Sequence, residues 1–269
     1  MKLFKALAKP QAAKPQAAVV KPAEPVLSAA DTEQVLRALQ QQTKTLTAAL
    51  TGIRKQLEHQ PYVVAELMRR YNHLIDGDMP MPVLGANWAA IAPTILFIVD
   101  EVMGRSARRT MLECGSGAST LWTAAALRKC GEGHVTSVEH DREFAEVTRQ
   151  RLVDHGLESW ATVVDAPLVD TEVPGLGTQP WYDLSGLGDI TDVDLLFIDG
   201  PPRPTAPLAR YPAMPQLLPR LAKGALVVLD DTNRKVERDI TKMWASDGAF
   251  DRRVTFVKDV ARSTVLQLD

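Results

Sequence analysis

Apolar residues follow two different periods along the chain, and the change between them divides it into two parts. Within residues 31–58 the apolar side chains recur at alternating spacings of three and four, with Thr43 as a polar interruption. Asp31 and Gln34 resemble a helix-start capping pair. We therefore predict a helix here that forms a coiled coil with further copies of the chain. A single amphipathic helix lying on the rest of the chain is the alternative.

From Pro61 onward, strand and helix patterns alternate. Residues 193–198 and 225–229 are continuous apolar runs, which is typical of strands buried on both faces. The other predicted strands are residues 109–113, 134–139, 160–164, 253–258 and 263–268. The predicted helices are residues 62–75, 88–103, 119–130, 142–155, 207–222 and 235–246. This order predicts a doubly wound, mostly parallel α/β sheet, whose ligand lies beyond the carboxyl ends of the strands.

The first 30 residues lack the large apolar side chains that build a core. Residues 7–30 are an Ala, Pro, Lys and Gln tract, which predicts a disordered or extended linker. Residues 1–60 carry nine Lys and Arg against four Asp and Glu, although the whole chain has a net charge of -2. We favour a solubilising tether over a segment that binds an anionic partner. The predicted organisation is a linker at 1–30, a coiled-coil helix at 31–60 and a folded domain at 61–269.

The composition of the 269 residues argues against several classes of protein. A pI near 6.2 is unlike that of a nucleic-acid-binding domain. Cys114 and Cys130 are too few for a disulfide scaffold, and no Cys/His spacing suggests zinc. No apolar run approaches the ~20 residues that cross a bilayer, and Lys5 interrupts the initial apolar stretch before it could serve as a secretory signal. We therefore expect a cytoplasmic location.

The first strand of the domain leads into a glycine-containing turn, Glu113-Cys114-Gly115-Ser116-Gly117-Ala118-Ser119-Thr120. Gly115 and Gly117 allow a tight turn and close approach of a ligand to the backbone. A dinucleotide fingerprint would have glycine where Thr120 stands, which makes an NAD site less favoured. Glu113 would repel a pyrophosphate but suits a ligand with a cationic end.

Two further strands also end in carboxylates. Glu139 and His140 follow the second strand, where a carboxylate can accept hydrogen bonds from both hydroxyls of a ribose. Asp165 follows the third strand, where it could accept from an adenine amino group or simply form a turn.

This ordered set resembles the class I S-adenosylmethionine-dependent methyltransferases over roughly residues 85–269. The resemblance rests on ECGSGAST, the acidic VEHD about 20 residues later, FIDGPP and GALVVLDD, in that order. It implies a seven-stranded sheet with an antiparallel hairpin at the last strand. It also implies that S-adenosylmethionine binds at Glu113, Gly115, Ser116, Gly117, Ser119, Thr120, Glu139, His140 and Asp165, with Trp88 as a roof over the ligand or a core residue.

Asp199, Asp230 and Asp231 end the fourth and fifth strands and are the catalytic candidates. Three carboxylates at adjacent strand ends can bind magnesium or another hard divalent cation, which would lower the pKa of an acceptor hydroxyl. The trio resembles that of metal-dependent O-methyltransferases acting on catechols or sugars, although Asp230-Asp231 and Gly-Pro-Pro depart from the catechol type. The alternative without metal has Asp231 capping the next helix and Asp199 contacting cofactor or acceptor.

Several other residues carry weaker predictions. We expect Arg203 and Arg210 to be solvated in a surface loop, rather than to bind an acidic acceptor. We predict a loop at residues 168–190, and we expect Trp181 and Tyr182 to pin it to the domain rather than to stack on a sugar. Cys114 has no base partner nearby in sequence and is interpreted as a small packing residue.

The function that this sequence favours is methyl transfer to a hydroxyl of a small molecule or glycan. An aminopropyltransferase shares the fold, but the helical amino-terminal part speaks against it. A non-catalytic, nucleoside-binding scaffold assembled by the coiled coil is the third interpretation. Expected partners are the acceptor and other copies of the chain, without nucleic acid or a transmembrane segment.

Overall fold

The computed structural model describes residues 28–74 and 89–269 of the chain. The predicted linker, apart from its last three residues, and Trp88 lie outside the described residues. The chain divides into two compact units, residues 1–52 and 53–269. Among the described helices, none combines the length and apolar character that a membrane span requires.

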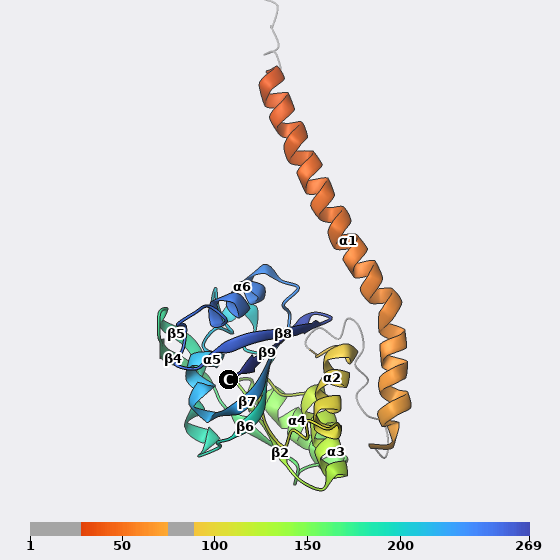
Figure 1. Cartoon of the computed structure of the whole chain (residues 1–269), viewed down its shortest axis with the longest axis vertical. Coiled ribbons are helices and arrows are strands. Elements are labelled where there is room, and N and C mark those ends of the chain that lie inside the picture. The colour runs from red at the N-terminus through yellow and green to blue at the C-terminus, as the bar shows by residue number, and fades with distance from the viewer. Residues whose placement is uncertain (1–27, 75–88) are drawn as a thin grey trace, which may run out of the picture. The chain divides into compact units, whose positions relative to one another are not determined.

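The second unit is built on a seven-stranded sheet (Figure 1) with the strand order β3-β2-β1-β6-β7-β9-β8. Its strands are β1 (Thr110–Cys114), β2 (His134–Glu139), β3 (Ala161–Asp165), β6 (Val193–Ile198), β7 (Leu221–Leu229), β8 (Val254–Val260) and β9 (Ser263–Leu268). The first five are parallel to one another, and β9 is antiparallel to β7 and β8. The predicted sheet and its closing hairpin are therefore confirmed.

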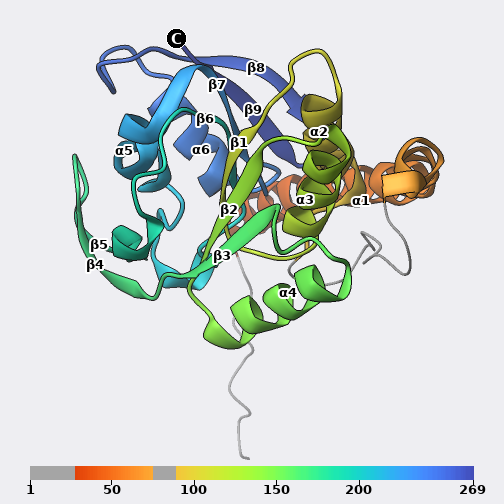
Figure 2. The same cartoon turned by 90° about the horizontal axis from the view of Figure 1, so that it is seen from below.

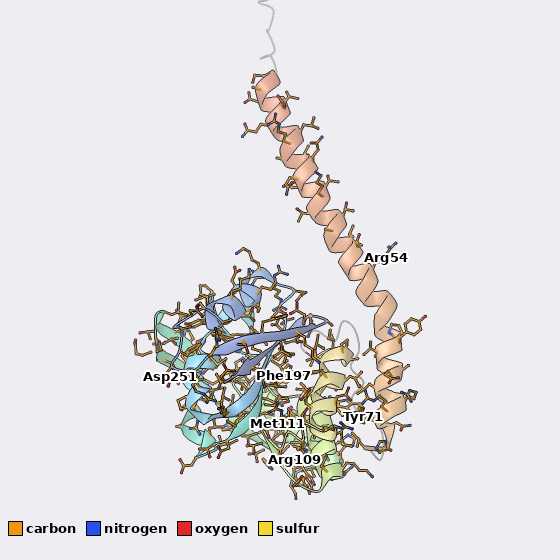
Figure 3. All side chains as sticks on the ribbon, in the orientation of Figure 1. Arg54, Tyr71, Arg109, Met111, Phe197 and Asp251 are labelled. Carbon is orange, nitrogen blue, oxygen red and sulfur yellow. The ribbon has the colours of Figure 1, made fainter. Side chains whose placement is uncertain are left out.

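Helices cover both faces of the sheet, because its central strands are apolar on both sides. They are α2 (Ala92–Met103), α3 (Ala118–Cys130), α4 (Arg142–Asp154), α5 (Ala213–Leu217) and α6 (Lys235–Trp244). One core lies between the sheet and α2, α3 and α4, and the other lies beneath α5 and α6 (Figure 2). Met111 and Phe197 on neighbouring strands belong to the first core (Figure 3).

The helix predicted at 207–222 is much shorter in the structure. Only α5 is α-helical, and the 3₁₀ turns η3 (Arg203–Thr205) and η4 (Leu218–Arg220) flank it. Four prolines fall in the predicted range, and each removes a backbone donor and restricts the preceding residue. Arg210 therefore lies in irregular backbone just before α5.

A second, two-stranded sheet replaces the loop predicted at 168–190. β4 (Leu168–Val173) and β5 (Gly177–Tyr182) form an antiparallel hairpin, followed by the 3₁₀ turn η2 (Leu184–Leu187). This hairpin stands where a doubly wound fold would have a helix between β3 and β6. Trp181 and Tyr182 at its end are buried in the core beneath α5 and α6, so they pin the segment to the domain as predicted.

The amino-terminal helix is α1 (Ala29–Tyr71), a single helix where the sequence predicted two that meet near Pro61. Its start is capped by Ser28 and Asp31, not by Asp31 and Gln34. The Ser28 hydroxyl donates to Asp31 Oδ2 at 2.6 Å, and the Asp31 N–H donates to the Ser28 hydroxyl at 3.2 Å. Ser28 lies directly before the first helical residue, which is the position where a side-chain cap satisfies free N–H groups.

The last turn of α1 packs on the domain. Leu67 and Tyr71 are buried in the same core as α2, and Leu74 of η1 (Asn72–Leu74) joins them. The Tyr71 hydroxyl donates to Asp100, and Arg70 forms an ion pair with the same carboxylate. Apolar contact and a paired charge therefore fix this end of α1 to α2.

Candidate active site at the carboxyl ends of the strands

Functional side chains gather where the parallel strands end, which we call the rim. Cys114 lies opposite Val138 on one side and Ile198 on the other, and Glu139 lies opposite Asp165. The chain order reverses between β1 and β6, so the glycine turn and Asp199 face each other at the switch point of the sheet. A Cβ built on Gly115 would lie 3.6 Å from the Asp199 carbonyl carbon.

The glycine turn leaves its outer side open. Gly115 and Gly117 have φ values of 96° and 151°, which side chains with a Cβ rarely adopt. No described atom lies within 4 Å of a Cβ placed on Gly117. The Gly117 N–H donates to the Thr120 hydroxyl at 3.0 Å, which fixes the turn against the start of α3. Open space next to a helix N-terminus is suited to a ligand.

Glu113 is completely buried beneath this turn. Its Oε2 accepts hydrogen bonds from the Thr120 hydroxyl at 2.6 Å and the Ser137 hydroxyl at 2.7 Å, while Oε1 has no partner among the described residues. Burial raises the pKa of the Glu113 carboxyl to about 7, against the opposing effect of the Thr120, Ser137 and Ser119 hydroxyls. The side chain can therefore bind a cationic group by giving up a proton near neutral pH.

Glu139 is also buried, but its charge is well supported. Its Oε2 accepts from the Ser116 N–H at 2.8 Å, and Oε1 accepts from the Asp141 N–H at 3.0 Å and lies 2.9 Å from His140 Nδ1. Burial opposes ionisation, but the contacts with His140, Ser116 and Asp141 outweigh it and lower the pKa of Glu139. Glu139 is thus an anion beside the glycine turn and can accept further hydrogen bonds.

Asp165 and His140 lie at the same edge. Asp165 is half exposed and pairs with Arg149 at 2.6 Å. The His140 ring is partly exposed and meets Tyr182 edge-on, with the ring centroids 6.1 Å apart. Glu113, Glu139 and these two residues, with the turn from Gly115 to Thr120, form what we call the cofactor half of the rim.

The other half of the rim holds Asp199, Asp230 and Asp231, each with one oxygen within 4.8 Å of the others. Arg210 lies among them: its Nη2 donates to Asp199 Oδ1 at 3.1 Å, to Asp231 Oδ2 at 3.0 Å and to the Asp199 carbonyl at 2.9 Å. Arg210 Nη1 donates to the Asp230 carbonyl at 3.0 Å. The prediction that Arg210 is solvated is wrong, since this residue is 5% exposed.

Two more arginines complete this half. Arg262 donates through Nη2 to Asp230 Oδ2 at 2.8 Å, and Ser263 donates to Asp230 Oδ1 at 2.7 Å. Arg234 lies 2.9 Å from Asp231 Oδ2. We call these residues the aspartate–arginine cluster: Asp199, Asp230, Asp231, Arg210, Arg234 and Arg262. Each of the three aspartates therefore has a guanidinium partner, and Arg234 also lies 3.7 Å from Glu237.

Comparison with known proteins gives the family. Residues 112–232, from β1 to the turn after β7, match the methyltransferase-domain family Methyltransf_24. The chain carries a methyltransferase domain of the class I S-adenosylmethionine-dependent type. No curated protein matches the sequence. The rim residues lie almost entirely within the matched range.

Several solved structures are similar to this chain. S-adenosylhomocysteine-bound PaMTH1 of Podospora anserina gives a TM-score of 0.52 at 11% identity, covering 77% of this chain and 88% of that one. Cofactor-bound Rv0187 from MTB gives 0.47 at 24% identity, covering 77% and 88%. The O-methyltransferase TomG of Streptomyces achromogenes, in complex with S-adenosylmethionine, gives 0.46 at 19% identity, covering 77% and 87%.

The aspartate–arginine cluster of this methyltransferase does not fit a resident divalent cation. Such an ion lies 2.0–2.6 Å from its oxygen ligands. Arg210 Nη2 instead contacts Asp199 Oδ1 and Asp231 Oδ2 together, so a nitrogen lies between two of the oxygens that a metal would need. Both Asp230 oxygens are also occupied, by Arg262 and Ser263. Asp231 does not cap α6, which begins without a side-chain cap.

Tyr182 is a rim residue that the sequence did not single out for this place. It is 2% exposed, and its hydroxyl has no hydrogen-bond partner among the described residues. A Cβ on Gly200 would lie 2.1 Å from this hydroxyl, so glycine directly after Asp199 makes room for it. The sequence did contain one indication of strands in this segment. Val169, Thr171 and Val173 alternate with acidic residues, which is typical of a strand.

A pocket of about 440 Å³ lies elsewhere in the methyltransferase, between α6 and the β8–β9 hairpin. Its lining includes Asn233, Arg238, Lys242 and Phe256. It contains neither the glycine turn nor the acids of the cofactor half. This pocket is therefore separate from the glycine turn and the two glutamates.

Proposed function

We propose that the chain transfers the methyl group of S-adenosylmethionine to a hydroxyl oxygen of a small-molecule or glycan acceptor. The observation that carries the proposal is the open glycine turn, which has two buried carboxylates on one side and Asp199 on the other. S-adenosylmethionine supplies an electrophilic methyl group on a positively charged sulfur. The cofactor half suits such a ligand, because no described arginine or lysine forms an ion pair with Glu113 or Glu139.

Each residue of the cofactor half has a role in this proposal. Glu139 accepts hydrogen bonds from the ribose hydroxyls, and Asp165 lies toward the adenine. Glu113 compensates the positive charge of the methionine part. The turn residues Gly115, Ser116, Gly117, Ser119 and Thr120 bring the backbone close to the ligand. His140 orients Glu139 through its 2.9 Å contact.

Asp199 is the proposed general base. It accepts the proton of the acceptor hydroxyl, whose oxygen forms a bond to the methyl carbon while the carbon–sulfur bond breaks and its electron pair stays on sulfur. Burial and the charge of Asp230 raise the pKa of Asp199 well above its ordinary value, despite Arg210. A raised pKa matches a base that works near neutral pH. The Asp199 side chain keeps 15% exposure, enough for contact with an acceptor.

The test begins with calorimetric binding of S-adenosylmethionine, followed by a screen of hydroxyl acceptors with labelled methyl. Asp199→Asn keeps the shape of the side chain but removes the base, so we expect transfer to fall by about 10²- to 10⁴-fold with cofactor affinity unchanged. Binding without transfer to any acceptor would favour the nucleoside-binding scaffold. Turnover only with decarboxylated S-adenosylmethionine would favour an aminopropyltransferase.

We also propose that residues 31–58 join copies of the chain. Four leucines of the predicted stripe, Leu36, Leu39, Leu46 and Leu50, are each more than half exposed on α1. Exposed apolar stripes with this spacing pack against a second helix. Light scattering should show an oligomer that the double variant Leu39→Asp/Leu46→Asp converts to a monomer, whereas Gln41→Asp should leave it intact. A monomeric parent chain would contradict the proposal.

A further inference from the structure

We propose that the guanidinium group of Arg210 occupies the position of a catalytic divalent cation, so that this enzyme works without a metal. The inference rests on the methyltransferase function proposed above and concerns the same rim. It starts from the place of Arg210 in the aspartate–arginine cluster. Asp199, Asp230 and Asp231 end adjacent strands, with one oxygen of each within 4.8 Å of the others. Without Arg210, such a set of oxygens would be a cation site.

The first argument is geometric. Arg210 Nη2 lies 3.1 Å from Asp199 Oδ1 and 3.0 Å from Asp231 Oδ2, which are oxygens on two different strand ends. A cation bridging these two carboxylates would need the same space. The same guanidinium also donates to the Asp199 and Asp230 carbonyls, at 2.9 and 3.0 Å. Arg210 thus joins the ends of β6 and β7, as a bridging metal would.

The second argument is charge. Arg262 and Arg234 pair with Asp230 and Asp231, and Arg234 also lies 3.7 Å from Glu237, so three guanidiniums face four carboxyl groups. A divalent ion added to this set would turn the net charge of this buried region positive, which is unfavourable. Burial lowers the pKa of Arg210, but the three aspartates outweigh it and the net shift is upward. Arg210 therefore keeps its charge.

Arg210 acts as a positioning residue in this arrangement. It holds the carboxylate and the carbonyl of Asp199 at once, and this fixes the direction in which the remaining oxygen of Asp199 faces the acceptor. A planar guanidinium with several fixed donors is suited to hold two carboxylates in one geometry. A lysine provides the charge but not this set of directions.

The decisive experiment compares manganese binding by full-length variants, measured by calorimetry with Mn²⁺ alone and again with S-adenosylhomocysteine. The parent chain and Arg210→Lys should show no Mn²⁺ site, because a cation still occupies the cluster. Arg210→Met should gain one site per chain, at least about tenfold tighter than any binding by the parent. The double variant Arg210→Met/Asp199→Asn should lose that site again. Arg220→Met, which removes an arginine bonded to the Gly188 and Ile190 carbonyls, is the matched control.

Arg210→Met leaves carboxylates uncompensated, so its folding is followed by circular dichroism with and without Mn²⁺. If the variant unfolds readily, Mn²⁺ should raise its melting temperature while leaving that of Arg220→Met unchanged. The proposal is overturned if the parent chain binds one Mn²⁺ that Asp199→Asn abolishes. It is also overturned if Arg210→Met neither binds Mn²⁺ nor is stabilised by it. Because Mn²⁺ alone is the probe, failure to bind S-adenosylhomocysteine would count against the proposed function and not against this result.

Discussion

Glu113 and Glu139, on the cofactor half of the rim, are held by hydroxyl groups, backbone N–H groups and one imidazole, whereas Asp199, Asp230 and Asp231 are held by arginines. Both sets lie at the ends of strands of one sheet, and all but Asp199, whose side chain is 15% exposed, are buried. On the cofactor half no guanidinium lies against either glutamate in the described chain. On the other half three guanidiniums lie within 4 Å of the aspartates.

Under the proposed function, this difference follows from the kind of ligand that each half would bind. A ligand with its own positive charge is favoured next to carboxylates that have no resident cation, and it compensates them when it binds. A neutral hydroxyl acceptor offers no such charge, so the carboxylates beside it need permanent partners. The cofactor half is thus completed by its ligand, while the aspartate–arginine cluster is complete within the protein.

Arg262→Met gives the largest expected effect on stability. It leaves Asp230, which is fully buried, without its guanidinium partner. Removing one partner of a buried ion pair costs about 3–5 kcal/mol, so we expect the free energy of unfolding in urea to fall by about 3 kcal/mol. Adding Asp230→Asn should restore more than half of this loss, because no unpaired charge then remains.

The matched control comes from the cofactor half. Arg149 and Asp165 form an ion pair there, but both side chains are about a third or more exposed. Arg149→Met should cost about 1 kcal/mol or less, since exposed pairs are worth little. Equal losses in Arg149→Met and Arg262→Met would show that the two halves do not differ in the way described here.

Gly117→Val tests the open side of the glycine turn. Valine introduces a side chain where no described atom lies within 4 Å of a Cβ, and at a φ of 151° that valine rarely adopts. We expect the affinity for S-adenosylmethionine to fall by about 100-fold or more, or about 2.7 kcal/mol, in calorimetry. Gly175→Val, in the turn of the β4–β5 hairpin, has an equally open and positive-φ site and should not change the affinity. Normal binding by Gly117→Val would place the cofactor elsewhere.

Much of this rim could be predicted from the sequence, because its residues stand at or after strands that the sequence pattern predicts. β2 and β6 begin and end at the predicted residues, and Glu139 and Asp199 stand directly at or after their ends. A buried strand has a strong local pattern, and the residue that follows it is placed by the sheet. The local sequence pattern was therefore sufficient to predict where the carboxylates lie.

The partners of these carboxylates could not be predicted in the same way. Arg210 lies in proline-rich irregular backbone, whose local pattern does not say which side chains reach the rim. Arg262 stands in the turn between β8 and β9, 32 residues from Asp230. One physical signal was available: three buried carboxylates need counter-charges, and no lysine or arginine lies within five residues of Asp199 on the strand side. That requirement predicts that an arginine far away in the sequence reaches the rim, but it does not identify which arginine.

The pH dependence of cofactor binding sharpens the comparison further. Glu113 has a pKa of about 7 without ligand, raised from 4.5 by burial, so it is mostly protonated at pH 6 and mostly ionised at pH 8. A cationic ligand binds the ionised form, so affinity for S-adenosylmethionine should rise about tenfold from pH 6 to pH 8 in calorimetry. Stability without ligand should change in the opposite direction, falling as pH rises from 4.5 through 7, because the folded state holds the proton more tightly.

Glu113→Gln provides the control for this effect. It removes the titrating group while keeping oxygen for the Thr120 and Ser137 hydroxyls. Its affinity should be nearly constant between pH 6 and pH 8 and lower than that of the parent at pH 8. If the affinity of the parent chain for S-adenosylmethionine does not change over this pH range, Glu113 does not contact the cationic part of the ligand.

Tyr182→Phe carries the smallest expected effect and tests the boundary between the two halves. The Tyr182 ring meets His140 on the cofactor half, while its hydroxyl lies at Gly200, next to Asp199. Because this buried hydroxyl makes no hydrogen bond within the described chain, removing it should leave the free energy of unfolding within about 0.5 kcal/mol of the parent or raise it. Trp181→Phe, which alters the fully buried neighbouring ring, should lower it by more than about 1 kcal/mol, in line with the cost of a core cavity. A loss in Tyr182→Phe as large as that in Trp181→Phe would show that the hydroxyl has a partner within the folded chain, and the two halves would then share a polar link.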